Sequence, residues 1–254
     1  MSSTLQRTER DSILLLTLNR PEARNSMNFE LASALATAMD ELDAREDLRL
    51  GIITGADGTF CAGMDLKEFL KGSRPSIPGR GFGGLTEKPP RKVLIAAVEG
   101  YALAGGFELA LACDLIVAAD NANFGLPEVK RGLVAGAGGL VRLPRRLPFH
   151  VAMECALTGS MLSAQRAHAY GLVNRLTVPG EALAVAQELG STIAANGPLA
   201  IATSKQVIVE SVDWPTREMF ALQRALTDPV FASADAREGA AAFAEKRKPV
   251  WTGN

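Results

Sequence analysis

The sequence predicts an α/β fold followed by a purely helical region. Short runs of β-branched residues and leucine alternate with longer helical patterns as far as Pro179, an order typical of parallel strands joined by helical crossovers. After Pro179 every pattern is helical. A chain of 254 residues can also bury a substantial core. We therefore expect an α/β core at residues 1–190 and a helical region at residues 191–254.

The expected elements follow from the spacing of the apolar residues. Short apolar runs bounded by turn residues indicate strands, and apolar residues three or four positions apart indicate helices. The expected strands are 13–18, 51–54, 93–98, 115–119 and 172–176. The expected helices are 28–44, one that begins near Asp65, 106–112, 180–196, 198–212, 215–228 and 234–246. The strand-and-helix unit recurs irregularly, as a spiral or solenoid would.

The stretch from Lys71 to Pro90, KGSRPSIPGRGFGGLTEKPP, has the weakest signal for regular structure. It is rich in glycine and proline and has a basic bias, which is typical of a mobile loop. Two interpretations remain open. The stretch is either a solvated connector or a flap over a binding pocket.

The charge of the chain argues against a partner held by a general electrostatic field. With 27 basic and 28 acidic residues the net charge is −1, which gives no global attraction to nucleic acid or to an anionic membrane. The apolar run from Ile13 to Leu18 is too short for a signal peptide or a membrane span. We expect a cytoplasmic protein with neither nucleic acid nor membrane as a partner.

The cysteines and histidines do not form a recognisable metal or catalytic set. Cys61, Cys113 and Cys155 are widely spaced among small or apolar neighbours, so we interpret them as packing residues in a reducing compartment. His150 and His168 have no cysteine near them, which leaves a zinc site without ligands. Neither histidine sits in a context that supports a Ser-His-Asp triad, and we expect surface or hydrogen-bonded structural roles.

Two glutamates occur where a structural role for glutamate is unusual. Glu108 lies among residues that are apolar all round a helical turn, so its carboxyl group should be buried. A buried carboxyl group needs a partner, or stays ionised at a desolvation cost of several kcal/mol, or has a raised pKa suited to general acid or base catalysis. Glu128 follows Pro127, which biases Leu126 towards an extended backbone and fixes the approach of the chain. Taken alone, Glu128 fits a surface turn equally well.

Two glycine turns precede helix starts. Ala62 and Gly63 separate a strand from the helix near Asp65, and Gly105 and Gly106 precede the segment that contains Glu108. Helix N-termini carry backbone N–H groups without intrahelical partners. Two such ends facing each other would form an oxyanion hole for a carbonyl oxygen that gains enolate charge. Alternatively, the glycines only permit tight turns and close packing.

Five segments carry a resemblance that spans nearly the whole chain. They are NRPEARNSMN at 19–28, GIITGADGTFCAGMDLKEF at 51–69, GYALAGGFELALACDLIVAADNANFGLPEVKRGLVAGAGG at 100–139, LTGSMLSAQRAHAYGLVNRL at 157–176 and AFAEKRKPVW at 242–251. In this order they resemble the crotonase family, the enoyl-CoA hydratase/isomerase superfamily. The resemblance implies a ββα spiral core, a helical C-terminal region, and homotrimers or dimers of trimers. It also implies an acyl-CoA thioester substrate with no metal or redox cofactor.

The resemblance implies a role for each matched residue. The backbone N–H groups of Met64 and Gly105 would form the oxyanion hole. Glu108 and Glu128 would be catalytic, with Glu108 activating the water and Glu128 exchanging the α-proton. The residues implied in substrate or CoA binding are Arg24, Ala62, Met64, Asp65, Leu66, Lys67, Phe243 and Lys246.

Three departures from the family pattern carry expectations of their own. Ala104 stands where the family commonly has glycine, which is tolerable if this residue needs no positive φ. Met64 stands where a smaller residue is frequent, so the acyl specificity is open. The basic stretches Arg142–Arg146 and Lys246–Lys248 are expected to be solvated faces, although the second coincides with the tail that contacts CoA in the family.

Reversible hydration of a trans-2-enoyl-CoA is the expected reaction, because water addition uses two carboxyl groups whereas proton shuttling alone can use one. An enoyl-CoA isomerase or another enolate chemistry is the first alternative, since an oxyanion hole serves several reactions. An acyl-CoA-binding protein with little catalytic activity is an alternative of another class.

Overall fold

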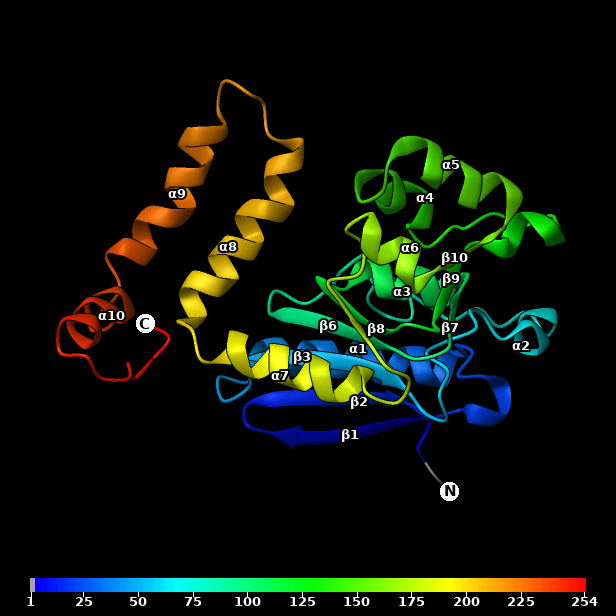
Figure 1. Cartoon of the computed structure of the whole chain (residues 1–254), viewed down its shortest axis with the longest axis horizontal. Coiled ribbons are helices and arrows are strands. Elements are labelled where there is room, and N and C mark those ends of the chain that lie inside the picture. The colour runs from blue at the N-terminus through cyan, green and yellow to red at the C-terminus, as the bar shows by residue number, and fades with distance from the viewer. Residues whose placement is uncertain (1–2) are drawn as a thin grey trace.

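A six-stranded sheet forms the centre of the molecule (Figure 1). The computed structural model describes residues 3–254. The strand order is β1-β2-β3-β6-β8-β11; the strands are β1 Leu5–Arg10, β2 Ile13–Leu18, β3 Leu50–Gly55, β6 Val93–Val98, β8 Leu115–Ala119 and β11 Arg175–Thr177. Strands β1 and β2 pair antiparallel, and every other neighbouring pair in this sheet is parallel.

A smaller sheet of order β10-β9-β7 accompanies the large one. It consists of β7 Tyr101–Leu103, β9 Asn123–Gly125 and β10 Met161–Ser163. Strands β7 and β9 are parallel, and β9 and β10 are antiparallel. A two-stranded hairpin, β4 Ser76–Ile77 and β5 Gly81–Phe82, stands apart from both sheets.

Ten α-helices and four 3-10 turns complete the part of the chain from residue 3 onward. The helices are α1 Phe29–Ala44, α2 Leu66–Leu70, α3 Gly105–Ala112, α4 Gly139–Arg142, α5 Phe149–Thr158, α6 Ala164–Ala169, α7 Ala182–Ala194, α8 Pro198–Glu210, α9 Met219–Phe231 and α10 Ala234–Ala244. The 3-10 turns are η1 Pro21–Ala23, η2 Pro127–Arg131, η3 Leu143–Arg145 and η4 Ser211–Asp213.

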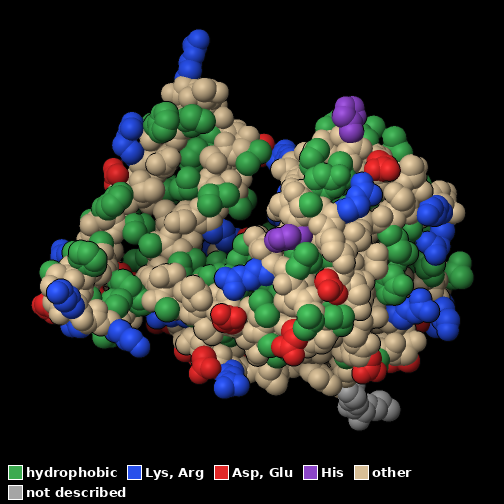
Figure 2. All heavy atoms as spheres, in the orientation of Figure 1, with side chains coloured by type: hydrophobic (Ala, Val, Ile, Leu, Met, Phe, Trp, Pro, Cys, Tyr) green, Lys and Arg blue, Asp and Glu red, His purple; other side chains and the backbone are tan. Residues whose placement is uncertain are grey.

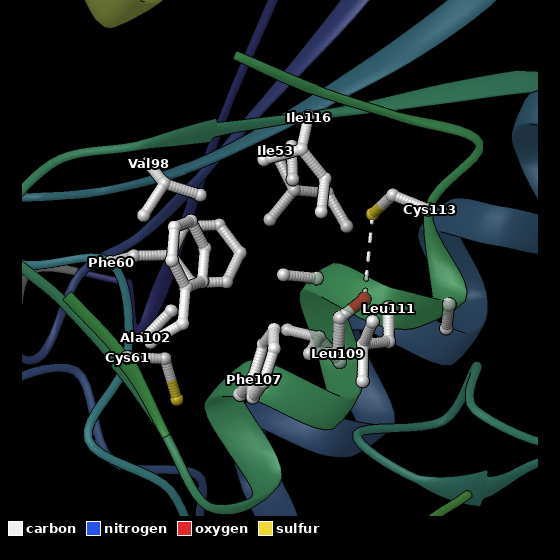
Figure 3. Close-up of a cluster of buried hydrophobic side chains, with 14 of the residues drawn as sticks. Ile53, Phe60, Cys61, Val98, Ala102, Phe107, Leu109, Leu111, Cys113 and Ile116 are labelled. Atoms are coloured by element: carbon white, nitrogen blue, oxygen red, sulfur yellow. Dashed lines mark hydrogen bonds between the residues drawn. The ribbon is translucent and has the colours of Figure 1, made fainter. Parts of the chain in front are cut away.

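The central strands are apolar on both faces because both faces are covered. Ile52, Ile95 and Val117 belong to the cluster that packs under α7. Ile53 and Ile116, one position away in their strands, belong to the opposite cluster, which contains the apolar residues of α1 and α3. Alternate side chains of a strand point to opposite faces. Figure 3 shows the second cluster, in which α3 packs against β3, β6 and β8.

Helices α8, α9 and α10 form an arm that extends away from the two sheets (Figure 1). Neither α8 nor α9 contains a fully buried residue. Figure 2 shows apolar side chains on the surface of this arm and a hollow between it and the body. The exposed large apolar residues on the arm are Ile208, Val209, Val212, Phe220, Phe231, Phe243 and Val250.

One partly buried lysine ties the arm to the body. Lys205 of α8 donates from Nζ to Asp114 Oδ2 at 2.6 Å and to the carbonyl oxygens of Pro90 and Lys92 at 2.8 and 2.9 Å. Trp251, which follows α10 near the C-terminus, returns to the start of the arm: its Nε1 donates to the carbonyl oxygen of Ala195 at 2.8 Å. The arm therefore has fixed contacts at its base, while most of its length is exposed.

The α/β fold and the expected long elements are confirmed. The strand expected at 172–176 begins three residues later, at Arg175. The helix expected at 215–228 begins four residues later, at Met219, and helices α4 and α5 were not expected. The strands that were not expected are β1, β4, β5, β7, β9 and β10. Five of these strands have two or three residues, and β1 has an exposed polar surface, so none carries a strong apolar pattern. The division between residues 190 and 191 stays a prediction.

The segment 71–90 is more structured than its composition predicts. It contains the β4–β5 hairpin, and Arg80 pairs with Asp40 of α1 at 2.7 Å. Three glycines of the run Gly81–Gly84 adopt positive φ, which lets the backbone pass close to α1. The helices of residues 3–254 include none long and apolar enough to cross a membrane.

Candidate active site

The two glutamates lie at the same end of two adjacent parallel strands. Strand β7 leads into Gly105 and α3, which carries Glu108, and β9 leads into η2, which carries Glu128. Leu103 is paired with Gly125 in the register of these strands, and Ala104 N donates to Gly125 O at 2.8 Å. Parallel strands end at the same edge of a sheet. Glutamates 20 positions apart therefore follow the same edge of this sheet.

A third segment brings the other glycine turn to this edge. Cys61 forms a parallel bridge with Ala102, and Leu103 N donates to Cys61 O at 3.0 Å. A Cβ on Gly63 would lie 3.4 Å from Gly105 N, so the two glycine turns are in contact. Met27 N donates to Gly63 O at 2.7 Å, and Asp65 N donates to Met27 O at 2.9 Å.

The backbone N–H groups of Met64 and Gly105 are available to a ligand. Within residues 3–254, neither donates to an acceptor. The hydrogen bonds on either side of Met64 go to Met27, and Gly105 is the first residue of α3. Two unpaired backbone donors on adjacent turns are the groups that an oxyanion hole requires, because such a site consists of preorganised donors beside the reacting group.

Ala104 does need a positive φ, so the condition under which alanine would be tolerable here is not met. Its φ is 52° and its ψ is −127°, a region where a Cβ is unfavourable and glycine is the usual residue. The turn requires this conformation because Ala104 must pair with Gly125 and, in the next residue, begin a helix. Strain of this type is typically about 1–3 kcal/mol and is concentrated at functional sites.

The Glu108 carboxylate is buried and held by backbone donors. The residue is 2% exposed, and Oε1 accepts hydrogen bonds from Ala137 N at 2.7 Å and Gly139 N at 2.8 Å. Burial raises the pKa of Glu108, although these two N–H groups and the positive charge of Arg142 oppose the rise. The expected burial is confirmed, and the carboxyl group is fixed in one orientation.

The Glu128 carboxyl group is less constrained. It lies on a 3-10 turn, not in the open loop or surface turn that the sequence allowed, and its Oε2 is buried without a hydrogen-bond partner in the described chain. Burial raises the pKa of Glu128 to about 7. Its own backbone N–H and Arg131 lower the pKa, whereas the charge of Glu108 raises it. A carboxyl group that titrates near neutrality suits a general acid or base.

The Asp65 side chain supports the turn that contains Met64. Its Oδ2 pairs with Arg20 Nη2 at 2.8 Å, and its Oδ1 accepts from Lys67 N at 3.0 Å, which caps α2. Burial opposes ionisation of Asp65, but Arg20 and the N–H groups of Glu68 and Lys67 bring its pKa below the ordinary value. Both carboxylate oxygens are therefore engaged within the protein.

The structure brings together six of the eight residues expected to bind substrate or CoA. Ala62 N donates to Arg24 O at 3.1 Å, and the run from Ala62 to Lys67 follows directly. Arg24, Leu66 and Lys67 are exposed. Phe243 and Lys246 are also exposed, but they lie on the arm, far from α2 within one chain (Figure 1).

Two further residues adjoin the site. A Cβ on Gly105 would overlap the ring of Phe82, so this ring packs against the oxyanion turn. Arg142 is half-buried and donates from Nη2 to Thr86 O, which makes the expectation of a solvated face wrong for this residue. The FGG run at Phe82 was a signal for close backbone approach. A single basic stretch gave no signal that separated Arg142 from its exposed neighbours.

The cysteines and histidines lie outside this arrangement. Cys61, Cys113 and Cys155 are free and buried, as expected of packing residues. His168 Nδ1 bonds to the carbonyl oxygen of Val173 at 2.8 Å. Across residues 3–254, no group of three or more His, Cys, Asp and Glu residues could hold a metal ion.

Comparisons with known proteins agree over the full length. The family model described as enoyl-CoA hydratase/isomerase matches residues 8–254. A carnitinyl-CoA dehydratase of Proteus mirabilis is 41% identical over 261 aligned residues, with all of both chains covered. Crystal structures of enoyl-CoA hydratases from Mycobacterium marinum and Mycobacterium tuberculosis are 59% and 56% identical, each with a TM-score of 0.98 and full coverage of both chains.

Proposed function

Because the chain belongs to the enoyl-CoA hydratase/isomerase family, we propose that it reversibly hydrates a trans-2-enoyl-CoA to a 3-hydroxyacyl-CoA with Glu108 and Glu128 as its acid–base pair. Its relatives make it a hydratase or dehydratase that acts on CoA thioesters. The observation that carries the finer proposal is the pair of sequestered carboxyl groups beside two unpaired N–H groups.

In the proposed reaction, ionised Glu108 orients a water molecule and accepts its proton as the oxygen attacks Cβ. Electron density moves to the thioester oxygen, which accepts hydrogen bonds from Met64 N and Gly105 N. Protonated Glu128 then delivers its proton to Cα. A proton passes from Glu108 to Glu128 through solvent before the next turnover, so the cycle is balanced.

The proposed reaction is redox-neutral and uses only carboxyl and backbone groups, so we include no metal or redox cofactor beyond the coenzyme A of the substrate. Arg24 and the segment from Ala62 to Lys67 would contact the CoA portion next to the oxyanion turn. We place the protein in the cytoplasm, a reducing compartment consistent with its three free cysteines.

We also propose that the arm packs on neighbouring copies in a homotrimer or a dimer of trimers. Its large apolar residues are exposed in the single chain, and exposed apolar faces of this extent are typical of interfaces. Phe243 and Lys246 would then reach CoA in a neighbouring copy, because the arm directs them away from the site of their own chain (Figure 1).

Steady-state hydration of crotonyl-CoA tests the acid–base pair. Glu108→Gln and Glu128→Gln should each lower kcat by about 10² or more, the usual effect of losing a general acid or base. Glu188→Gln is the control, because this exposed residue lies on α7 away from the strand ends. Wild-type kcat in either of the first two variants would remove that residue from the mechanism.

The alternative reactions are separated by substrate. Migration of the double bond in a 3-enoyl-CoA, faster than hydration, would indicate an isomerase, and no turnover of any thioester would indicate a binding protein. The relatives named carnitinyl-CoA dehydratases make a substrate with a trimethylammonium group one candidate. An aromatic or anionic lining of the acyl pocket would favour such a group. The kcat/KM values for crotonobetainyl-CoA, crotonyl-CoA and longer or steroid-derived enoyl-CoAs would identify the acyl group.

A further inference from the structure

Arg142 lies against the turn that holds Glu108. The donors to Glu108 Oε1 are Ala137 N and Gly139 N, at the start of α4. Arg142, at the end of this four-residue helix, folds back so that a Cβ on Gly138 would overlap its Nη1. The guanidinium group thus covers the backbone between the two donors. Only a glycine at 138, with φ of 98° and no side chain, leaves this space.

The cation at this position has no carboxylate in direct contact. Within residues 3–254, no Asp or Glu oxygen lies within 4.0 Å of the Arg142 guanidinium group. Its polar contact through Nη2 is the carbonyl oxygen of Thr86. A half-buried charge without a close carboxylate loses hydration that no ion pair compensates, which normally destabilises a fold. Its position beside a buried carboxylate suggests that the charge serves Glu108.

The surroundings of the two glutamates are unequal. Glu108 accepts two backbone N–H bonds and feels the positive charge of Arg142 of α4, whereas Oε2 of Glu128 has no partner in the described chain. Two other charged groups affect these residues. Arg131 of η2 lowers the pKa of Glu128, and Arg146 lowers the pKa of Arg142. The charge of Glu108 also raises the pKa of Glu128, so the protonation of one carboxyl group depends on the other.

We propose that Arg142 is the positioning residue that makes the two glutamates unequal. It holds Glu108 in the ionised form that accepts the proton of water, and it thereby leaves the shared proton on Glu128, which delivers it to Cα. This inference rests on the proposed hydration and assigns the direction of proton transfer within it.

The pH dependence of kcat/KM for crotonyl-CoA tests this role. Hydration requires ionised Glu108 and protonated Glu128, so the rate falls at low pH as Glu108 gains a proton and at high pH as Glu128 loses one. In Arg142→Gln the pKa of Glu108 should rise. The acid limb should move up by about one pH unit, a tenfold loss on that limb, while the basic limb stays in place. The amide retains a donor for Thr86 O.

Two variants provide matched controls. Arg142→Lys keeps the charge, so its acid limb should stay within about 0.3 pH units of wild type. Arg131→Gln should move the basic limb upward and leave the acid limb, because Arg131 acts on Glu128. An acid limb that is unmoved in folded Arg142→Gln, or moved equally in Arg142→Lys, would overturn the proposal.

A second measurement needs no change at Arg142. Infrared difference spectra at pH 6 should show that Glu128→Gln removes a protonated carboxyl band, whereas Glu108→Gln removes carboxylate bands. The opposite assignment would overturn the inference even if every Arg142 variant failed to fold. Full hydration activity in both glutamine variants would instead refute the proposed function itself, so the two failures are distinguishable.

Discussion

The strand ends that hold the glutamates and the C-terminal arm are organised in opposite ways. At the strand ends, polar groups are taken out of water, and Glu108 is held in place by backbone donors. On the arm, large apolar groups such as Phe220 and Phe243 remain in water, 66% and 88% exposed. Glu108 in the first region is held entirely by donors of its own chain. The arm has an exposed apolar surface, which neighbouring copies of the chain would cover in the proposed assembly.

The largest expected effect compares a phenylalanine from each region. Phe107 is fully buried beside Phe124, with ring centroids 5.2 Å apart, so Phe107→Ala should lower the free energy of unfolding by about 3–5 kcal/mol. Phe220→Ala should change it by less than about 0.5 kcal/mol in the dissociated chain and instead weaken assembly. Urea unfolding at low protein concentration and sedimentation measure the two effects. An equal loss of stability would show that the arm packs on its own chain.

The next effect concerns the support of the oxyanion turn. Asp65→Asn retains a helix cap but leaves Arg20 without its carboxylate, so we expect a loss of roughly 2 kcal/mol in unfolding free energy. We also expect about a tenfold lower kcat, because the Met64 N–H loses its fixed position. Asp47→Asn, which removes an exposed partner of Arg45, is the control. The same kcat in both variants would contradict a supporting role for Asp65.

A smaller effect follows from the pKa of Glu128, which burial raises to about 7 in the folded chain from an ordinary glutamate value of 4.5. The native state therefore binds more protons than the unfolded state between these values. Glu128 therefore stabilises the fold below its pKa in the unfolded chain, and this stabilisation is lost as the pH rises to about 7. Because solvent screens this half-buried group, we expect the difference to be about 1 kcal/mol. Relative to wild type, Glu128→Gln should therefore gain about 3 °C in melting temperature across this interval and then no more. A constant difference from pH 4.5 to 7 would argue against the raised pKa.

The smallest effect tests the strain at Ala104. Ala104→Gly relieves the unfavourable Cβ at a φ of 52° but adds entropy to the unfolded chain, so the net gain in stability should be about 1 kcal/mol. Thermal unfolding at fixed protein concentration measures the gain, with Ala184→Gly on the exposed side of α7 as a destabilised control. Loss of stability in Ala104→Gly would show that Ala104 is not strained.

The sequence predicted the elements whose own residues determine them. The strand at Val93–Val98 is a continuous apolar run, and Phe29–Ala44 combines a helical apolar period with a capping Asn28. Burial of Glu108 followed from its apolar neighbours alone. The short strands β7 and β9 gave no such signal, because three residues are too few for a pattern to show.

The site itself depended on contacts between distant segments. Local sequence determined that Glu108 would be buried, that the C-terminal quarter would be helical, and that turns containing Gly63 and Gly105 would precede helices. Only the tertiary structure decided that Glu128 lies on a 3-10 turn beside Glu108, that Ala104 adopts positive φ, and that Arg142 reaches Thr86 and not solvent. The physical reason is that apolar periodicity and helix caps act within a few residues of the chain. Strand register, desolvation and the electrostatic field at a carboxyl group depend instead on residues that folding brings together.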